Sequence, residues 1–404
     1  MIKGHGDDRY SFEHPIRVDF SSNVYSNVDL KELKEHLRQR IDAIGHYPEP
    51  EPYTLEAQLA RIHGVDPAAV CVTNGATEAI YLIAHAFAGS RSAVLQPTFS
   101  EYTDACRLYG HTIVPHAQPE PFWASEGAWP KRTVAAAPGF PTLENERSGA
   151  GDIPSNERFS ARATEYQSDA ERRSRVKPGM PEERSDAERT MIWLCNPNNP
   201  TGSVIPKKIL ENQIVDNPDI VFVIDQSYGA FTQEPLLSAA EAAAYPNLLQ
   251  LHSMTKRYAM PGLRLGYVTG TPELIDRIRA ARMPWSVNAL AIEAGLFLCR
   301  HPETAALDLA ALLAEARRLA AALNAIPGIT AETTQTHFML CRIEKHSAAK
   351  LKHWLAEKHG ILIRDASNFE GLDSHCFRIA TQAPAENDSL VKAIHEFLNE
   401  TPDE

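Results

Sequence analysis

Short runs of apolar residues alternate with segments of helical periodicity through the first 280 residues of the chain. The alternation is clearest at 68–89, 92–110, 190–202 and 219–231, where each apolar run has the length of a strand. Strands that are apolar throughout lie in sheets covered on both faces, and intervening helices make the strands parallel. The sequence therefore predicts an α/β fold in which a mostly parallel sheet lies between helices.

A different pattern begins after about residue 280. An Ala- and Leu-rich segment at 301–329 predicts a long helix closed by a Pro-Gly pair. Short strand-like runs follow at 337–343, 361–364 and 376–382, before a final helix. This pattern is typical of a smaller α+β unit, separate from the parallel sheet.

The two patterns predict a large domain at 27–280 and a small domain built from an N-terminal arm, 1–26, together with 281–404. One segment fits neither, because residues 142–188 are rich in Arg, Glu, Ser and Pro and contain SDAER twice. Without apolar periodicity this segment cannot build a core. We expect a mobile surface insertion that carries no chemistry.

Composition narrows the classes of function. A formal net charge of −12 argues against nucleic-acid and anionic-membrane partners, which require a basic face. The six cysteines are scattered without a C-x-x-C spacing, so neither a disulfide framework nor a metal cluster is expected. The N-terminus has no apolar signal core, and no apolar run approaches 18 residues. These features predict a cytoplasmic protein that acts on a small molecule.

Ligands of open parallel sheets bind at the carboxyl ends of the strands, so the residues just after each strand carry the information. The first strand is followed by TNGATEA (73–79), which places Gly75, Ala76 and Thr77 where a helix begins. Small residues there allow backbone N–H groups to converge on a phosphate. The next strand is followed by QPTFSEY (96–102), in which Phe99 is expected to stack on a planar ring.

Two further strand ends carry polar groups. In NPNNPTG (196–202), two Asn-Pro units make a rigid loop in which Asn199 is expected to donate an amide hydrogen to a phenolate oxygen. In VIDQSYGAF (223–231), Asp225 ends an apolar strand and Tyr228 follows three residues later, in the same predicted site. A buried carboxylate is costly unless a cation pairs with it, and a protonated pyridine nitrogen would serve.

The stretch LHSMTKRYAMPGLRLGYVTG (251–270) supplies the missing amine, Lys256, just after Ser253. One ligand needs all these groups, because pyridoxal 5′-phosphate has a phosphate, a planar ring, a phenolate oxygen, a ring nitrogen and an aldehyde. Lys256 is then the Schiff-base lysine, with Ser253, Thr77 and Arg264 on the phosphate. Asp225 would keep the ring nitrogen protonated so that the ring acts as an electron sink.

With these motifs in this order, the sequence resembles the fold-type-I pyridoxal-phosphate enzymes of the aspartate aminotransferase superfamily, over nearly the whole chain outside 142–188. Two families within it compete, histidinol-phosphate aminotransferase and L-threonine-O-3-phosphate decarboxylase of cobalamin synthesis. GHGDD (4–8), VDFSSN (18–23), RMPWSVNALA (282–291) and GLDSHCFRIA (371–380) are similar to decarboxylase stretches. The third of these discriminates most, because an aminotransferase need not have it.

The resemblance implies roles for further residues. Arg378 should bind the substrate carboxylate, and His5, Asn23 and Arg364 should surround the substrate phosphate. Tyr47 should reach the cofactor phosphate of the neighbouring subunit, which implies a homodimer with shared active sites. A substrate with a carboxylate and a phosphate needs two cationic anchors, and the planar fork of arginine suits both.

The sequence departs from the family pattern at three places. The asparagine of SSNVYSN (21–27) is not followed by the usual Asn-Pro, and two further departures lie near the expected site. DQSY (225–228) stands where relatives have Asp-Glu-Ala-Phe or Asp-Glu-Ala-Tyr, and His337 stands where they carry an asparagine near the substrate. These departures leave the substrate contacts open without affecting cofactor binding.

Three functions follow from the sequence. The first is pyridoxal-phosphate-dependent decarboxylation of L-threonine O-3-phosphate to (R)-1-amino-2-propanol phosphate. The second is an aminotransferase of histidinol-phosphate type, which would use almost the same residues. The third is a protein of this fold kept for binding or regulation, and the presence of Lys256, Asp225, Asn199 and Arg264 argues against it.

Overall fold

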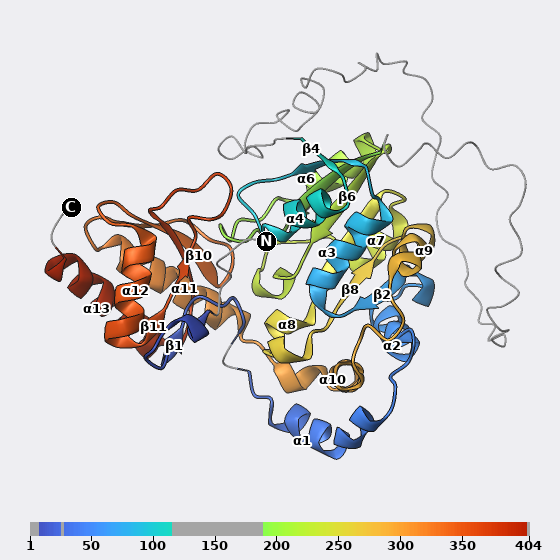
Figure 1. The fold of residues 1–404 in the computed structure, drawn as a ribbon, viewed down its shortest axis with the longest axis horizontal. Helices are drawn as coiled ribbons and strands as arrows, with labels where there is room; N and C mark the ends of the chain where they lie inside the picture. The colour runs from blue at the N-terminus through green and yellow to red at the C-terminus, as the bar shows by residue number, and fades with distance from the viewer. Residues whose placement is uncertain (1–7, 26–27, 115–188, 402–404) are drawn as a thin grey trace, which may run out of the picture. The chain divides into compact units, whose positions relative to one another are not determined.

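The computed structural model describes residues 8–25, 28–114 and 189–401 of the 404-residue chain. A seven-stranded sheet lies among the helices that cover it (Figure 1). In order across the sheet, the strands are β2 (Val70–Thr73), β8 (Gly266–Thr269), β7 (Leu248–Ser253), β6 (Ile220–Asp225), β5 (Thr190–Cys195), β3 (Arg91–Val94) and β4 (Thr112–Val114). Only β8 runs antiparallel to its neighbours. The predicted α/β fold with a mostly parallel sheet is therefore confirmed.

Helices cover both faces of this sheet, as the apolar strands require. They are α3 (Gly75–Ala86), α4 (Glu101–Leu108) and α9 (Pro272–Ala281) on one face, and α6 (Lys207–Asp216) and α7 (Ala239–Ala244) on the other. Successive side chains of strand β5 point to opposite faces of the sheet, and so they pack into different cores. Trp193 packs into the core beneath α3 and α9, whereas Ile192 and Leu194 pack into the core beneath α6.

A third apolar core joins α1 (Lys31–Gln39), α2 (Tyr53–His63) and α10 (Ala289–Arg300) to β2 and β8. Leu33, Leu55 and Leu59 pack there with Val72 and Ile292. Helix α10 therefore packs with elements of the predicted large domain, although it follows residue 280. The domain boundaries remain predictions, and this packing favours a boundary later in the chain.

The C-terminal part forms an antiparallel sheet. Its order is β12 (Arg364–Asp365), β13 (Cys376–Ala380), β10 (Phe338–Ile343) and β9 (Ile329–Ala331). Its core includes residues from α11 (Leu309–Asn324), α12 (Ala348–His359) and α13 (Pro384–Glu400). At 17 residues, α13 is the longest helix among the described ranges, and no helix there is long and apolar enough to cross a membrane.

The N-terminal arm joins this C-terminal part through a strand pair and a buried ring. Strand β1 (Val18–Asp19) pairs in parallel with β11 (Ile361–Leu362), and the two lie side by side in Figure 1. Phe20 is fully buried in the same core as Phe377. The arm is thereby fixed close to β13, which carries Arg378.

Two sequence predictions of local structure were wrong. The helix predicted over 301–329 begins only at Leu309, because the Asp308 side chain accepts a hydrogen bond from the Ala311 amide and caps that end. The strand-like run at 361–364 is split between two sheets, since β11 pairs with β1 and β12 pairs with β13. Short 3₁₀ turns lie at Arg9–Ser11, Ile41–Gly45, Pro67–Ala69, Gly229–Phe231, Pro261–Leu263 and Pro302–Ala305.

Candidate active site

A pocket opens at the carboxyl ends of β5, β6 and β7, where a parallel sheet is expected to bind its ligand. The predicted site residues that line it are Asn23, Ala76, Thr77, Phe99, Asn199, Asp225, Tyr228, Ser253, Lys256, Arg264, Arg364 and Arg378. They come from strand ends, from the N-terminal arm and from the C-terminal sheet. Gly75 lies directly behind the lining, Tyr47 does not line this pocket, and His5 is outside the described residues.

One end of the pocket is suited to an anion. Helix α3 begins at Gly75, whose φ of +82° favours glycine. A Cβ on Gly75 would lie 2.5 Å from the Arg264 guanidinium, which would have to move to admit it. Thr77 and Ser253 line the same pocket. The free N–H groups of the helix start, its dipole and the guanidinium together suit a phosphate.

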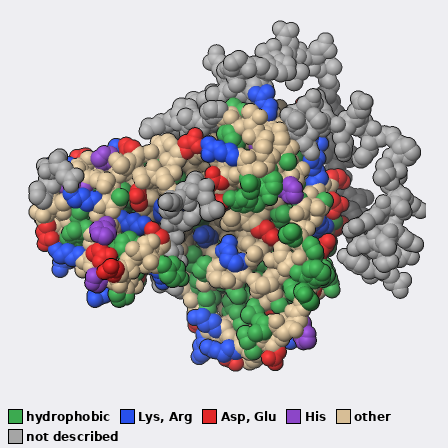
Figure 2. Space-filling model, viewed as in Figure 1, with side chains coloured by type: hydrophobic (Ala, Val, Ile, Leu, Met, Phe, Trp, Pro, Cys, Tyr) green, Lys and Arg blue, Asp and Glu red, His purple; other side chains and the backbone are tan. Residues whose placement is uncertain are grey.

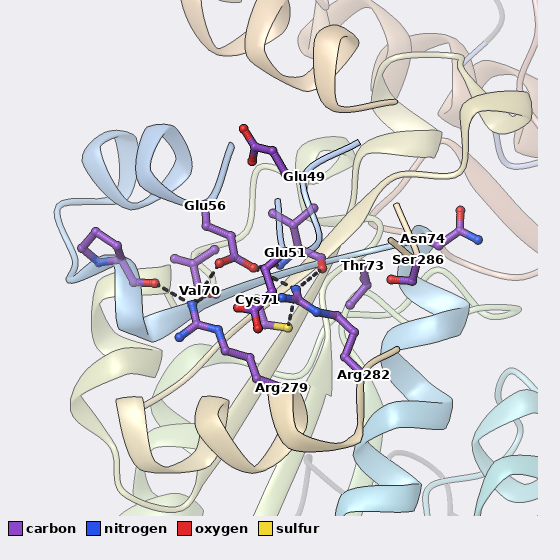
Figure 3. Close-up of polar contacts among 12 residues, drawn as sticks. Glu49, Glu51, Glu56, Val70, Cys71, Thr73, Asn74, Arg279, Arg282 and Ser286 are labelled. Atoms are coloured by element: carbon purple, nitrogen blue, oxygen red, sulfur yellow. Dashed lines mark hydrogen bonds and ion pairs between the residues drawn. The ribbon is translucent and has the colours of Figure 1, made fainter. Parts of the chain in front are cut away.

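The strand that leads into this helix is held from outside by an edge clamp, defined here as Glu56, Arg279 and Arg282 (Figure 3). Glu56 accepts the Val72 amide hydrogen at 3.0 Å and pairs with Arg282 at 2.9 Å and Arg279 at 3.0 Å. The two arginines donate in turn to the carbonyls of Val72 and Val70. The clamp satisfies backbone groups on the open edge of β2, and so it fixes the strand that leads to Gly75 at the start of α3.

Asp225 is buried and is bonded by two neutral donors. Its Oδ2 accepts the Tyr102 hydroxyl hydrogen at 2.7 Å, and its Oδ1 accepts the Ser227 amide hydrogen at 2.8 Å. Burial raises the pKa of the Asp225 carboxyl, whereas these hydrogen bonds and the charge of Lys256 act in the opposite direction. The sequence predicted a cationic partner, and these donors hold the carboxylate at the end of β6 ready for one.

Lys256 lies in α8 (Met254–Arg257), the single helical turn after β7. Its carbonyl accepts the Tyr25 amide hydrogen at 3.1 Å, which ties the turn to the N-terminal arm. Tyr228 lines the same pocket, and burial raises the pKa of its phenol, so the hydroxyl stays protonated as a donor at neutral pH. Amine and phenol thus line one pocket with Asp225.

Two buried arginines also line the pocket. Arg364 on β12 lies directly across from Arg378 on β13, and the two are 6% and 5% exposed. Arg378 donates to the Asn199 side-chain oxygen and to the Ser21 carbonyl. The Asn199 oxygen is thereby occupied, which leaves its amide hydrogens for a ligand. Arg378 lies within a strand rather than after one, and the cross-strand register places it beside Arg364.

Arg364 is also held by neutral acceptors. It donates to the Asp365 carbonyl at 2.7 Å and to the Asn368 side-chain oxygen at 2.8 Å, and its guanidinium lies 5.3 Å from the centre of the Phe369 ring. Within the described ranges, no carboxylate lies at ion-pair distance from Arg364 or Arg378. Burial lowers the pKa of both guanidinium groups, that of Arg378 to about 10. We call this couple the pocket arginines.

The N-terminal arm is bonded to the site at alternate residues. The Ser21 carbonyl accepts from Arg378, the Asn23 carbonyl accepts from His337 Nε2 at 3.2 Å, and the Tyr25 amide donates to Lys256. The Asn23 side-chain amide is buried and lacks a hydrogen-bond partner in the described structure. A buried polar group without a partner is costly, so this amide is suited to a ligand.

His337 itself does not line the pocket. Its ring lies 4.0 Å from that of Phe231, and burial lowers the pKa of its imidazole to about 3, so it is neutral. Its role in the structure is to hold the arm at Asn23. The sequence left the substrate contacts open at this position, and the structure shows His337 in contact with the arm.

The aminotransferase class I and II family model matches residues 15–123 and 161–394 of the chain. The chain belongs to this family. The resemblance to pyridoxal-phosphate enzymes is therefore confirmed, and the members of this family depend on that cofactor.

Individual relatives fall into two groups. Histidinol-phosphate aminotransferase of Desulfitobacterium hafniense is 30% identical over 88% of this chain and 85% of its own length. Threonine-phosphate decarboxylase of Salmonella typhimurium is 27% identical over 94% of this chain and 91% of its own. Among solved structures, L-threonine-O-3-phosphate decarboxylase from Porphyromonas gingivalis is 35% identical, covers 95% of this chain and all of its own, and superposes with a TM-score of 0.76.

The pocket of this class I and II enzyme suits pyridoxal phosphate. Gly75, with Arg264 against it, offers the anion cradle that the phosphate needs. Asp225 is a buried carboxylate held by neutral donors and suited to a ring nitrogen, and Lys256 supplies the amine. Phe99 lines the pocket and is suited to the ring face.

Several residues of the site could not be found by sequence reasoning. Tyr102, Ser227 and Phe369 line the pocket, and Ser21 contributes through its carbonyl. Tyr102 lies in the predicted helix after Phe99, where a tyrosine is as typical of a core as of a site. Every residue has a backbone carbonyl, so the sequence could not indicate that the carbonyl of Ser21 would contact Arg378.

Proposed function

We propose that this enzyme decarboxylates L-threonine O-3-phosphate with pyridoxal phosphate, giving (R)-1-amino-2-propanol phosphate, which would serve cobalamin synthesis, and carbon dioxide. The observation that carries the proposal is the couple of pocket arginines. Two buried cations lie side by side without a carboxylate at ion-pair distance among the described residues, which is costly in the ligand-free protein. A substrate with a carboxylate and a phosphate would neutralise both.

Each arginine has donors left for this substrate. Arg378 uses two of its five N–H groups, and its Nε is buried without a partner, so it is assigned the carboxylate. Arg364 also uses two, and it is assigned the phosphate together with the unpartnered Asn23 amide. These assignments agree with the roles that the family resemblance implies.

The remaining residues position the reacting carbon. Pyridoxal phosphate, when bound, withdraws electrons from the substrate α-carbon, so that a bond to this carbon can break. Arg378 orients the carboxylate relative to the cofactor ring, and the buried lining excludes water. The Lys256 amine, which lines the pocket, would return a proton to the α-carbon after carbon dioxide leaves.

A second candidate is an aminotransferase of histidinol-phosphate type. The observation that favours it is the Desulfitobacterium hafniense relative, whose name is histidinol-phosphate aminotransferase, at 30% identity. Glutamate, a common amino donor, carries two carboxylates and would also suit the pocket arginines. In this reaction Lys256 would move the α-proton, and no carbon dioxide would leave.

The surface around Tyr47 supports the proposal of a homodimer with shared sites. Tyr47 is 85% exposed and packs against Trp285, with ring centres 5.4 Å apart. Hydrophobic side chains gather over α2 and α10 in Figure 2. Large exposed hydrophobic residues in the neighbouring segments are Ile41, Ile44, Tyr53 and Met283. A second copy covering this surface would bring Tyr47 towards the partner subunit's cofactor.

The deciding experiment supplies L-threonine O-3-phosphate to the purified enzyme loaded with pyridoxal phosphate, without any keto acid. Release of carbon dioxide is expected, together with an amine phosphate product. Lys256→Ala should abolish both turnover and the visible absorption band of the bound cofactor. Exchange of amino groups between histidinol phosphate and 2-oxoglutarate, without carbon dioxide release from threonine phosphate, would replace the decarboxylase proposal by the aminotransferase.

A further inference from the structure

Tyr102 lines the pocket and contacts the buried carboxylate of Asp225. It lies on α4, is 1% exposed, and donates its hydroxyl hydrogen to Asp225 Oδ2 at 2.7 Å. Its ring lies 5.9 Å from that of Phe99 and 6.1 Å from that of Trp193, so packing fixes the direction of the hydroxyl. This hydroxyl has a defined target, the carboxylate assigned to the cofactor ring nitrogen.

The neighbouring thiol does not share this task. Cys195 lies beside Asp225 in the sheet register, but its thiol donates to the Pro197 carbonyl at 3.1 Å. Ser227 bonds the other carboxylate oxygen through its backbone amide, and its side chain also favours the ionised carboxylate. Tyr102 is therefore the residue whose side-chain hydroxyl bonds Oδ2, and its deletion would leave this carboxylate oxygen without that donor.

We infer that Tyr102 is a positioning residue, which holds Asp225 ionised and aimed at the ring nitrogen of pyridoxal phosphate. Burial disfavours the charged carboxylate, and a donated hydrogen bond favours it. One carboxylate oxygen has two lone-pair directions, so Oδ2 can accept from Tyr102 and still face a ring N–H. The inference rests on the cofactor assigned under the proposed function, and not on which reaction follows.

The chain offers a matched control on the helix that packs against α4. Tyr81 donates its hydroxyl to Glu101 Oε2, also at 2.7 Å, and does not line the pocket. Tyr81→Phe therefore deletes the same kind of bond, from a tyrosine to a carboxylate, away from Asp225. Tyr102→Phe deletes it at Asp225 and retains the packed ring.

The experiment measures binding by calorimetry with two probes that cannot bond covalently to Lys256. One is pyridoxine 5′-phosphate, and the other is its analogue with CH in place of the ring nitrogen. Tyr102→Phe should weaken binding of the first probe roughly tenfold and that of the second less than about twofold, because only the first has the nitrogen that Asp225 reads. Tyr81→Phe should change both by less than about twofold.

Equal weakening of both probes by Tyr102→Phe would overturn the inference, because the hydroxyl would then support only the shape of the pocket. Unchanged binding of both would overturn it as well. Should Tyr102→Phe not fold because the buried Asp225 carboxylate loses a donor, a comparison of Asp225→Asn with Asp225→Asn/Tyr102→Phe decides the question. The two should discriminate equally between the probes, and a further loss of discrimination in the double variant would overturn the inference. A wild-type protein that binds neither probe would overturn the cofactor assignment too, whereas absent carbon dioxide release would affect only the proposed reaction.

Discussion

The edge clamp and the pocket arginines both contain buried arginines, which differ in what they contact. The arginine of the clamp pairs with a carboxylate, whereas those of the pocket contact neutral acceptors. Arg282 is paired with Glu56 at 2.9 Å, and electrostatic interactions with Cys71 and Glu56 overcome burial and raise the pKa of its guanidinium. Among the described residues, the acceptors that Arg378 donates to are neutral, and burial lowers the pKa of its guanidinium. A buried charge that is neutralised within the chain serves the fold. One left uncompensated indicates a ligand of opposite charge.

The largest effect is expected from removing the counter-ion of the clamp. Glu56→Ala leaves the buried Arg282 and the partly buried Arg279 with the more exposed partners Glu51 and Asp276, and should lower the free energy of unfolding by about 3–5 kcal/mol. Urea denaturation measures this loss. Glu51→Ala is the matched control, because Glu51 pairs with Arg282 at 3.4 Å but its side chain is 60% exposed. A loss for Glu51→Ala as large as for Glu56→Ala would remove the distinction between buried and exposed partners.

The next effect tests the ligand of Arg364. Arg364→Ala should lower the specificity constant for L-threonine O-3-phosphate about ten- to a hundredfold, or about 1.5–3 kcal/mol, because a charge-assisted contact is lost. The loss should be small with unphosphorylated threonine. Arg378→Ala should weaken both substrates, since both carry the carboxylate. Equal losses of the specificity constant for the two substrates in Arg364→Ala would mean that Arg364 does not bind the phosphate.

The stability of the ligand-free protein should respond with opposite sign at the two sites. Arg378→Met removes an uncompensated buried charge, so the free energy of unfolding should stay unchanged or rise by up to about 1–2 kcal/mol. Arg282→Met removes a paired buried charge and leaves the buried Glu56 carboxylate without this partner, so the variant should be strongly destabilised. Thermal and urea denaturation of the two variants give the comparison. A clear loss of stability in Arg378→Met would show that its neutral acceptors compensate the charge.

The smallest effect concerns pH. Because burial lowers the pKa of Arg378 to about 10, its cation is present below that pH and is lost as the pH rises through it. Affinity for L-threonine O-3-phosphate should fall roughly twofold between pH 8 and pH 10, as half of this group deprotonates. In Arg378→Met this part of the pH dependence should vanish. Titration calorimetry at both values measures it, and an identical slope in the variant would assign the change to other groups.

The sign for stability follows from the same comparison. Between pH 10 and the ordinary pKa of arginine, Arg378 binds a proton in the unfolded chain but not in the native one. Its contribution to stability therefore increases with pH in that window. Arg282, whose pKa is raised, contributes in the opposite direction, and its contribution is lost as the pH rises through the raised pKa.

The sequence by itself determined the parallel sheet and the side of it on which chemistry would lie. Asp225 and Ser253 each end an apolar run, and the carboxyl ends of parallel strands meet at one edge. Local order along the chain was therefore enough to bring Asp225, Asn199 and Lys256 together. It also named Gly75, since the start of a helix after a strand is a local feature.

Only the tertiary structure decided which distant side chains meet. Tyr102 reaches Asp225 across 123 positions, and Glu56 reaches Arg282 across 226. The pairing of Arg364 with Arg378 depends on the register of two antiparallel strands, one of them only two residues long. Apolar periodicity and turn residues report the local path of the backbone. They carry no information on which buried charge finds a partner, and that distinction separates the edge clamp from the pocket arginines.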